Sequence, residues 1–247
     1  MRNSMNEHHL ILPALRATLP CCPRQEVVCI GGGRPPAADW LAGLVAQDEK
    51  SGTDRPVWAI DRGVNICYSA GLPPAILIGD GDSANAAAWT WGATKAAQVH
   101  SFPPEKDDTD TELALHIAAK ETLPPLLILT AAFGGRLDHL MSTAAVAAHS
   151  SVPCVLADER ESLFYLHDGE TLHITCKNPP RAISLLPFTE ECTGITTKGL
   201  YWELTNAHIS NHTSLAVSNV LARNNSAKVF TVSIEHGVLG VYLCHIE

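Results

Sequence analysis

Carboxylates gather in four short segments of this sequence, and each segment follows a short apolar run. The segments are residues 61–65 (DRGVN), 79–83 (GDGDS), 106–115 (KDDTDTELAL) and 134–139 (GGRLDH). Carboxylate oxygens are the protein ligands that Mg²⁺ prefers, usually together with water and substrate phosphates. Lysine and arginine in the same segments are suited to phosphate oxygens, arginine through its two-pronged guanidinium. The four segments together predict a site for a metal-bound phosphate compound.

The second and fourth segments combine glycine with charge. Asp80 and Asp82 lie two residues apart on a turn that glycine relieves, so both can point at one ion. Gly134 and Gly135 precede Arg136 at the start of an apolar helical pattern, and a helix N-terminus favours anions. This arrangement is typical of phosphate binding.

Each segment also has a plain structural explanation. Asp-Gly-Asp-Ser is a common turn sequence. Thr109 and Glu112 match a helix capping box, and Asp138 could complement a helix N-terminus or pair with Arg136. The glycines at 31–33 complete no phosphate-loop motif, and we interpret them as a turn bordering a nucleotide. The hypothesis of a functional site rests on the convergence of the four segments.

The elements that position these segments follow from hydrophobic periodicity. Buried strands are predicted at residues 27–30, 57–60, 75–78, 97–101 and 126–130, and helices at 109–120 and 136–149. Strands alternating with helices predict a mostly parallel sheet covered on both faces. The carboxyl ends of parallel strands share one edge, where such sheets bind ligands, so the four segments can meet there.

The pattern changes after about residue 160. A hairpin is predicted around the Asp-Gly turn at 167–170, followed by strands at 182–186, 200–204, 214–217, 228–234 and 238–245, with no helix among them. We therefore predict an α/β domain over residues 1–160 and an all-β domain, a sandwich or barrel, over residues 161–247. The first twenty residues are interpreted as a loose lead-in.

Composition narrows the class of protein. The 247 residues carry a net charge of −9, which argues against a nucleic-acid surface, and no apolar stretch is long enough for a membrane span. The eight cysteines form no C-x-x-C pair and mostly lie in apolar runs, as expected of buried, reduced thiols. These features predict a cytoplasmic protein.

Taken together, the four segments resemble those of the thiamine pyrophosphokinase (thiamine diphosphokinase) family. That family carries D-G-G-A-N, G-D-F-D-S, K-D-x-T-D-T-E-L-A-L and G-G-R-x-D-H in this order and at similar intervals. Residues 198–206 (KGLYWELTN) and 217–219 (VSN) resemble the family's G-L-x-W-x-L and T-S-N segments. The resemblance covers about residues 55–245.

The resemblance implies transfer of diphosphate from ATP to the hydroxyl of thiamine by a homodimer, with thiamine between the α/β half of one subunit and the β half of the other. It implies that Asp80, Asp82 and Asp110 hold Mg²⁺ against the ATP phosphates. Residues that would line the phosphates and the attacking hydroxyl are Asp61, Asn65, Lys106, Asp107, Thr109, Arg136 and Asp138. The implied catalytic residues are Asp61, Asp80, Asp82, Asp110 and Arg136, with Asp61 as a candidate acceptor for the hydroxyl proton. The implied thiamine-binding residues are Trp202, Ser218 and Asn219.

Five positions depart from the family's segments. Arg62 stands in place of glycine, Val64 of alanine, Gly81 of phenylalanine, Ala216 of glycine and Val220 of glutamate. None of these changes removes a carboxylate. Three alternatives therefore stay open: diphosphate transfer to another alcohol such as a hydroxymethylpterin, a thiamine or nucleotide sensor without turnover, and a metal-dependent phosphatase.

Overall fold

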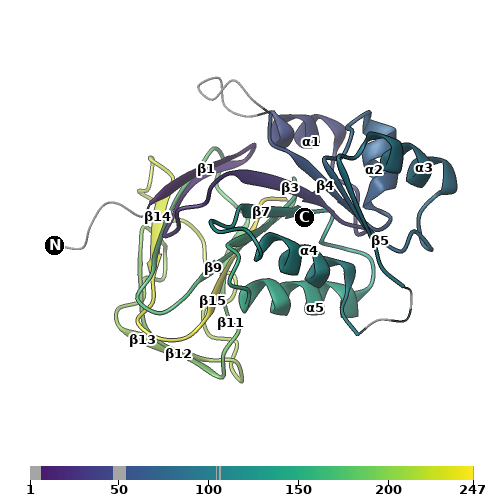
Figure 1. Ribbon diagram of the computed structural model, residues 1–247. Coiled ribbons are helices and arrows are strands. Elements are labelled where there is room, and N and C mark those ends of the chain that lie inside the picture. Colours follow the sequence, from purple (N-terminus) through teal and green to yellow (C-terminus); the bar gives the residue numbers. More distant parts are fainter. Residues whose placement is uncertain (1–6, 47–53, 104, 106, 247) are drawn as a thin grey trace. The chain divides into compact units, whose positions relative to one another are not determined.

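The computed structural model describes residues 7–46, 54–103, 105 and 107–246 (Figure 1). These residues divide into two compact units. An α/β unit comprises residues 23–158, and a β unit combines residues 7–22 with residues 159–246. The prediction that the chain contains an α/β part and a separate β part is confirmed.

A parallel sheet forms the centre of the α/β unit. Its strands are β3 (Glu26–Ile30), β4 (Val57–Ile60), β5 (Ile76–Gly79), β6 (Gln98–Ser101), β7 (Leu126–Thr130) and β8 (Cys154–Ala157). They lie in the order β8-β7-β3-β4-β5-β6, and all five pairings are parallel. Every residue of β3, β4, β7 and β8 is buried. Burial on both faces explains why these strands read as continuous apolar runs in the sequence.

Five helices connect the strands of this sheet. They are α1 (Ala38–Val45), α2 (Gly63–Ala70), α3 (Ala86–Lys95), α4 (Asp110–Ala118) and α5 (Leu137–Ala148). From β3 the chain moves through β4 and β5 to β6, then returns to β7 on the other side of β3. Right-handed crossovers therefore place α1–α3 on one face and α4–α5 on the other, as Figure 1 shows. The order reverses between β3 and β7, which makes the gap between their carboxyl ends the topological switch point.

The β unit contains two antiparallel arrangements. Six strands lie in the order β1-β2-β10-β14-β12-β13 and three in the order β11-β15-β9. The bounds of the first set are β1 (His8–Leu12), β2 (Leu15–Leu19), β10 (Thr171–Cys176), β14 (Val229–Ser233), β12 (Glu191–Lys198) and β13 (Ala207–Ser210). Those of the second are β11 (Ala182–Pro187), β15 (Leu239–Cys244) and β9 (Glu161–Leu166).

Several predictions for the β unit are wrong. The expected loose lead-in forms β1 and β2, and β2 pairs with β10, so residues 7–22 belong to the β unit rather than to the α/β domain predicted over 1–160. The Asp-Gly turn closes no hairpin, because β9 pairs with β15 while β10 pairs with β2 and β14. Neither 200–204 nor 214–217 is a strand; Leu200 only forms an isolated bridge with Leu221.

Most of the cysteines are buried, as predicted. All eight are free, and Cys29, Cys67, Cys154, Cys176 and Cys192 are buried. None of the helices in the described part of the chain has the length and apolar character needed to cross a membrane.

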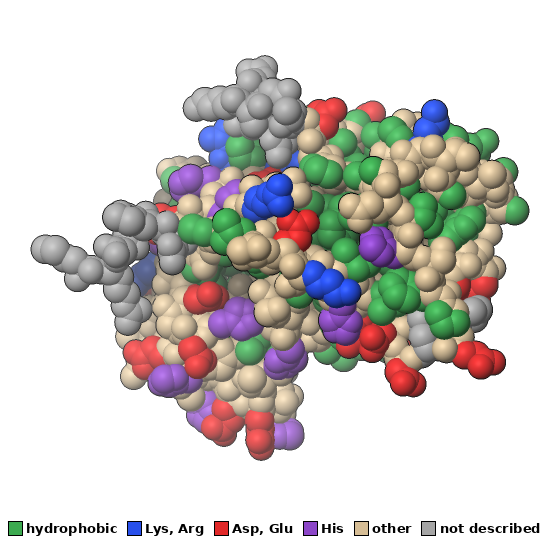
Figure 2. Space-filling view, viewed as in Figure 1, with side chains coloured by type: hydrophobic (Ala, Val, Ile, Leu, Met, Phe, Trp, Pro, Cys, Tyr) green, Lys and Arg blue, Asp and Glu red, His purple; other side chains and the backbone are tan. Residues whose placement is uncertain are grey.

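The view in Figure 2 shows acidic and histidine side chains gathered over β12 and β13 of the β unit. Among them, His208 Nε2 lies 3.4 Å from Glu191 Oε1. Lysine and arginine are scattered over this face, which is the opposite of the clustered basic surface that binds nucleic acid.

Candidate active site

A cavity of about 490 Å³ opens at the carboxyl edge of the parallel sheet. Its lining comes from the segments after β3, β4, β5 and β7 and from the beginnings of α4 and α5. The charged and hydroxyl-bearing side chains that line it are Asp61, Arg62, Asp80, Asp82, Ser83, Asp108, Thr109, Asp110, Thr111, Arg136, His139 and Thr143. Residues from all four segments thus line one cavity at the carboxyl edge of the sheet, where the sequence predicted that they could meet.

Three carboxylates form a compact cluster in this cavity. One oxygen from each of Asp61, Asp80 and Asp82 lies within 4.8 Å of the other two. Asp61 Oδ2 accepts a hydrogen bond from Ser83 Oγ at 2.5 Å, while Asp61 Oδ1 is buried and accepts none from the residues that the structure describes. A buried carboxylate oxygen without a donor is costly, and a bound cation would satisfy it. The all-oxygen donor set fits Mg²⁺.

Backbone geometry brings these carboxylates together. Asp61 has a φ of 48°, in the left-handed region, and its N–H donates to Ile78 O at the end of the neighbouring strand β5. Gly79 has a φ of 138°, and a Cβ there would lie 3.1 Å from Asp61 Cα. A glycine at 79 therefore allows the β4 and β5 turns to approach closely enough for their carboxylates to share one ion.

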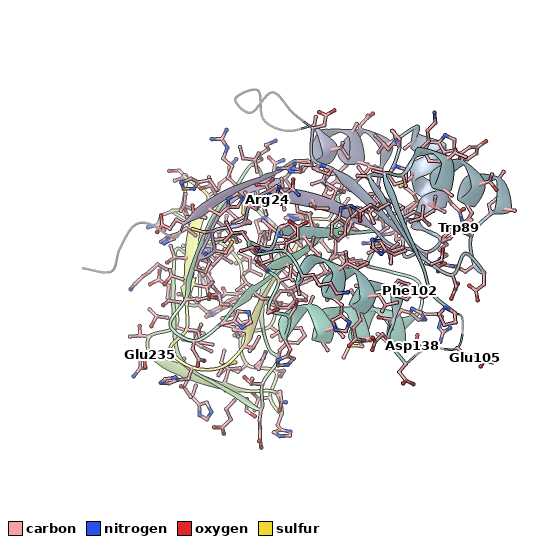
Figure 3. The ribbon with its side chains drawn as sticks, viewed as in Figure 1. Arg24, Trp89, Phe102, Glu105, Asp138 and Glu235 are labelled. Atoms are coloured by element: carbon pink, nitrogen blue, oxygen red, sulfur yellow. The ribbon has the colours of Figure 1, made fainter. Side chains whose placement is uncertain are left out.

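The ring of Trp89 leaves no room for a side chain at position 81. Gly81 has a φ of 75°, and a Cβ at this position would lie 2.8 Å from ring atoms of Trp89 in α3. Figure 3 marks Trp89 among the side chains of the α/β unit. The ring occupies the space that a larger residue at 81 would need, so the absence of phenylalanine at this position is compensated by an aromatic side chain from another element.

Loops at the switch point close over the end of the sheet. Gly31 N–H donates to Thr130 O at 2.9 Å, and Gly33 N–H donates to Ala131 O at 2.6 Å. A Cβ at position 33 would lie 2.5 Å from Ala131 O, so only glycine permits this contact. These bonds hold the glycine turn against the cavity, which Gly31, Gly32 and Gly33 help to line.

The fourth segment begins α5 with an ion pair. Arg136 donates from Nε to Asp138 Oδ1 at 3.1 Å and from Nη2 to Asp138 Oδ2 at 2.5 Å. The hydrogen bond from Arg136 lowers the pKa of Asp138 to about 2, so the pair stays charged at neutral pH. Arg136 lines the cavity and Asp138 does not. Asp138, labelled in Figure 3, therefore orients a cation that lines the cavity.

The third segment both caps helix α4 and lines the cavity. Thr109 is the N-cap of α4, where its Oγ1 accepts a hydrogen bond from Glu112 N at 3.3 Å. Both Thr109 and Asp110 also line the cavity. Asp110 lies outside the three-carboxylate cluster, whose third member is Asp61.

Two predicted phosphate-binding residues, Asn65 and Asp107, lie outside the cavity lining. Asn65 belongs to α2 and does not line the cavity; its Oδ1 accepts from Asn85 N at 2.9 Å and so supports the start of α3. Asp107 is exposed and also outside the lining. Lys106 lies outside the described residues.

The structure adds lining residues that the motifs did not single out, among them Arg62, Ser83 and Asp108. Ser83 was inside the GDGDS segment, but its hydrogen bond to Asp61 depends on the pairing of β4 with β5. Arg62 was visible only as a departure from the family's motif.

The predicted thiamine-binding residues lie in the β unit. Trp202 is 60% exposed and meets Tyr201 edge-on, with ring centroids 4.7 Å apart. Asn219 is buried; its Oδ1 accepts from Trp202 N at 3.2 Å and its Nδ2 donates to Trp202 O at 2.8 Å. Ser218 has a φ of 62°, and its N–H donates to Ser184 Oγ. Asn219 thus fixes the backbone that presents the exposed tryptophan.

Two family models match this chain. The model "Thiamin pyrophosphokinase, catalytic domain" matches residues 53–156, and the model "Thiamin pyrophosphokinase, vitamin B1 binding domain" matches residues 171–239. The first range contains every residue of the carboxylate cluster, and the second contains Trp202, Ser218 and Asn219.

Individual relatives agree with these matches. The chain is 28% identical over 190 residues to a thiamine pyrophosphokinase of Bacillus subtilis, covering 75% of this chain and 86% of that protein. A thiamin pyrophosphokinase structure from Geobacillus thermodenitrificans has a TM-score of 0.73 at 26% identity and covers 90% of this chain and 99% of the other. One from Candida albicans has a TM-score of 0.70 at 15% identity, covering 89% and 90%, and its likeness is one of fold.

Proposed function

The chain belongs to the thiamin pyrophosphokinase family, and we propose that its α/β cavity is where diphosphate is transferred from ATP to the hydroxyl of thiamine. The products are AMP and thiamine diphosphate. The observation that carries the assignment of the site is the carboxylate cluster of Asp61, Asp80 and Asp82, with its unsatisfied buried oxygen, at the switch point of the sheet.

In this proposal the cluster holds Mg²⁺. Asp80 and Asp82 supply ligands from the β5 turn and Asp61 supplies the third from the β4 turn, a role that replaces its candidacy as proton acceptor. Asp110 lines the same cavity from α4 and would add its negative charge to the site that holds the ion. When bound, the ion would neutralise phosphate charge and hold the chain of phosphates in line for attack.

The remaining residues position the nucleotide. Arg136, steadied by Asp138, binds phosphate oxygens at the α5 end of the cavity, and Thr109 offers its hydroxyl at the start of α4. The thiamine hydroxyl attacks the β-phosphorus and loses its proton to water, the bond from the β-phosphorus to the oxygen shared with the α-phosphate breaks, and AMP leaves with that oxygen. Alignment and neutralisation of charge are the main requirements of this chemistry.

The thiamine side is proposed for the β unit of a second copy of the chain. Trp202 offers an exposed ring of the kind that binds a cationic ring such as thiazolium, and Asn219 holds it in place. Exposed apolar side chains nearby in sequence, Tyr201, Leu215 and Val217, are consistent with burial in a homodimer.

The experiment that tests the function is AMP formation from ATP and Mg²⁺, with and without thiamine, with mass analysis of the product. We expect AMP only with thiamine, together with thiamine diphosphate. AMP formation with a hydroxymethylpterin in place of thiamine would show another acceptor. Inorganic phosphate without any acceptor would show a phosphatase, and tight binding without turnover would show a sensor.

A further inference from the structure

The residue Arg62 has no role in the site as described so far. It follows Asp61 directly, at the N-cap of α2, and its exposed side chain lines the cavity. Its Nε donates to Gly32 O, in the glycine turn after β3, at 2.5 Å. The bond ties the end of β4 to the end of β3, two neighbouring strands at the switch point.

Arg62 and Gly32 fit each other closely. A Cβ at position 32 would lie 2.5 Å from Arg62 Cγ and 2.6 Å from Arg62 Nε. Gly32 does not have a positive φ, and the three atoms nearest to a Cβ at this position all belong to Arg62, so an alanine there would clash first with the arginine. Glycine at 32 is therefore explained by the side chain that lies across it.

This arrangement leaves the outer part of the guanidinium available. The hydrogen bond to Gly32 uses Nε, and within the described residues neither Nη1 nor Nη2 has a hydrogen-bond partner. An arginine fixed through Nε presents its two terminal nitrogens as a fork, the geometry that suits phosphate oxygens.

The cavity lining carries more acidic side chains than basic ones. Its acidic side chains are Asp61, Asp80, Asp82, Asp108 and Asp110. Against them, the described part of the lining offers two guanidinium groups, Arg62 and Arg136, besides the imidazole of His139, and Arg136 already binds Asp138 through two nitrogens. A polyphosphate entering this acidic cavity needs positive charge near its oxygens in addition to a metal ion.

We propose that Arg62, held across Gly32, is a phosphate-binding residue for the nucleoside triphosphate. This inference rests on the proposed function, since it assigns a further contact to the nucleotide of that reaction. It places a cation from the β4–α2 turn on the β3 side of the carboxylate cluster, while Arg136 supplies one from the start of α5.

The first test is a calorimetric titration with a non-hydrolysable ATP analogue and Mg²⁺, in the absence of thiamine. Arg62→Ala should weaken binding about tenfold, because charge-assisted hydrogen bonds of this kind contribute about that factor. Arg62→Lys should recover part of the loss. The matched control is Arg24→Ala, which should bind the analogue normally. Arg24 is exposed, precedes β3 at the amino edge of the sheet (Figure 3) and pairs with Glu121.

Gly32→Ala separates this role from a general structural one. It should displace the Arg62 side chain and weaken binding of the analogue about as much as Arg62→Ala does. In the Arg62→Ala background, the same Gly32→Ala change should have no further effect, because the atoms with which it clashes are absent.

The outcomes distinguish this inference from the function on which it rests. Normal binding of the analogue by Arg62→Ala would overturn the role of Arg62 while leaving the reaction intact. Equal effects of Gly32→Ala in both backgrounds would also overturn it, since the glycine would then matter independently of the arginine. Failure of the unchanged protein to bind the analogue would overturn the proposed function, and this inference with it.

Discussion

Replacing Asp82 by asparagine should have opposite effects on stability with and without Mg²⁺. The oxygens of Asp61, Asp80 and Asp82 lie within 4.8 Å of one another, and Asp82 is exposed. Two unit charges at that distance repel by roughly 0.9 kcal/mol in a water-like dielectric. Without metal, Asp82→Asn therefore removes two such repulsions, together roughly 1.8 kcal/mol at that separation, and keeps the backbone bond from Asp82 N to Asp80 Oδ1.

The assay is thermal unfolding in chelator and again in excess Mg²⁺ with an ATP analogue. In chelator the melting temperature of Asp82→Asn should equal that of the unchanged protein or exceed it by a few degrees. With ligand at about a hundred times its dissociation constant, the unchanged protein should gain about 2.7 kcal/mol, and the variant should gain much less. Turnover of Asp82→Asn should fall at least about a hundredfold, as expected when a metal ligand is lost.

A matched control comes from the same unit. Glu121→Gln also removes one carboxylate, but Glu121 pairs with Arg24 away from the cavity, so the Mg²⁺-dependent gain in stability should persist. A lower melting temperature of Asp82→Asn in chelator would mean that Asp82 has a structural role. Normal Mg²⁺-dependent turnover would refute the assignment of the metal site.

Three further predictions concern other parts of the chain. Trp202→Ala should raise the KM for thiamine about tenfold and leave the KM for ATP within about twofold, as steady-state kinetics with each substrate varied would show; equal changes would contradict a separate thiamine side. Glu26→Ala should destabilise the α/β unit by about 3–5 kcal/mol in denaturant unfolding, because it leaves the buried Arg55 guanidinium without the carboxylate that it contacts at 2.5 Å; Glu26→Leu combined with Arg55→Met should cost less. Iodoacetamide at pH 8 should modify the exposed Cys22 in the folded protein and spare Cys67, since burial raises the pKa of the Cys67 thiol to about 12; mass analysis showing equal rates would contradict the burial of Cys67.

The sequence could predict that the four segments meet because the carboxyl ends of the strands in a parallel sheet lie side by side. Apolar runs marked β3, β4, β5, β6 and β7 to within one residue at their starts, and the carboxyl ends of such strands must share an edge. No local pattern could show that Asp61 rather than Asp110 completes the carboxylate cluster. That outcome depends on the left-handed backbone of Asp61 and on the approach permitted at Gly79.

Helix α3 escaped prediction because its apolar periodicity is weak. In α3, alanine, threonine and tryptophan give little contrast between faces, and only Ala88 and Gly92 are buried. Its start depends on Asn85, whose Oδ1 accepts from Ala87 N and Ala88 N and whose N–H donates to Asn65. The last of these contacts bridges two helices and therefore cannot be predicted from local sequence.

The strands at the N-terminus did carry a signal. Leu10 and Leu12 in β1, and Leu15, Ala17 and Leu19 in β2, are buried at alternate positions, which is the period of a half-buried strand. The partner β10 lies so far along the chain that nothing local indicated it. In β12, Gly194 has a φ of 69° and the register shifts between Cys192 and Ile195, which interrupts the alternation on which prediction relies.

The pairing of β2 with β10 also has a consequence for biosynthesis. The β unit has strands that precede the α/β unit and strands that follow it, since Ala17 pairs with Ile174 and β10 pairs with the still later β14. It is therefore completed only after the whole α/β unit has been translated. The α/β unit is continuous in sequence, so it can fold as a unit while the ribosome is still making the later strands. Before β10 has been translated, β1 and β2 can pair only with each other, and their apolar faces stay uncovered. We therefore expect nascent chains that stop before β10 to be the species most in need of a chaperone.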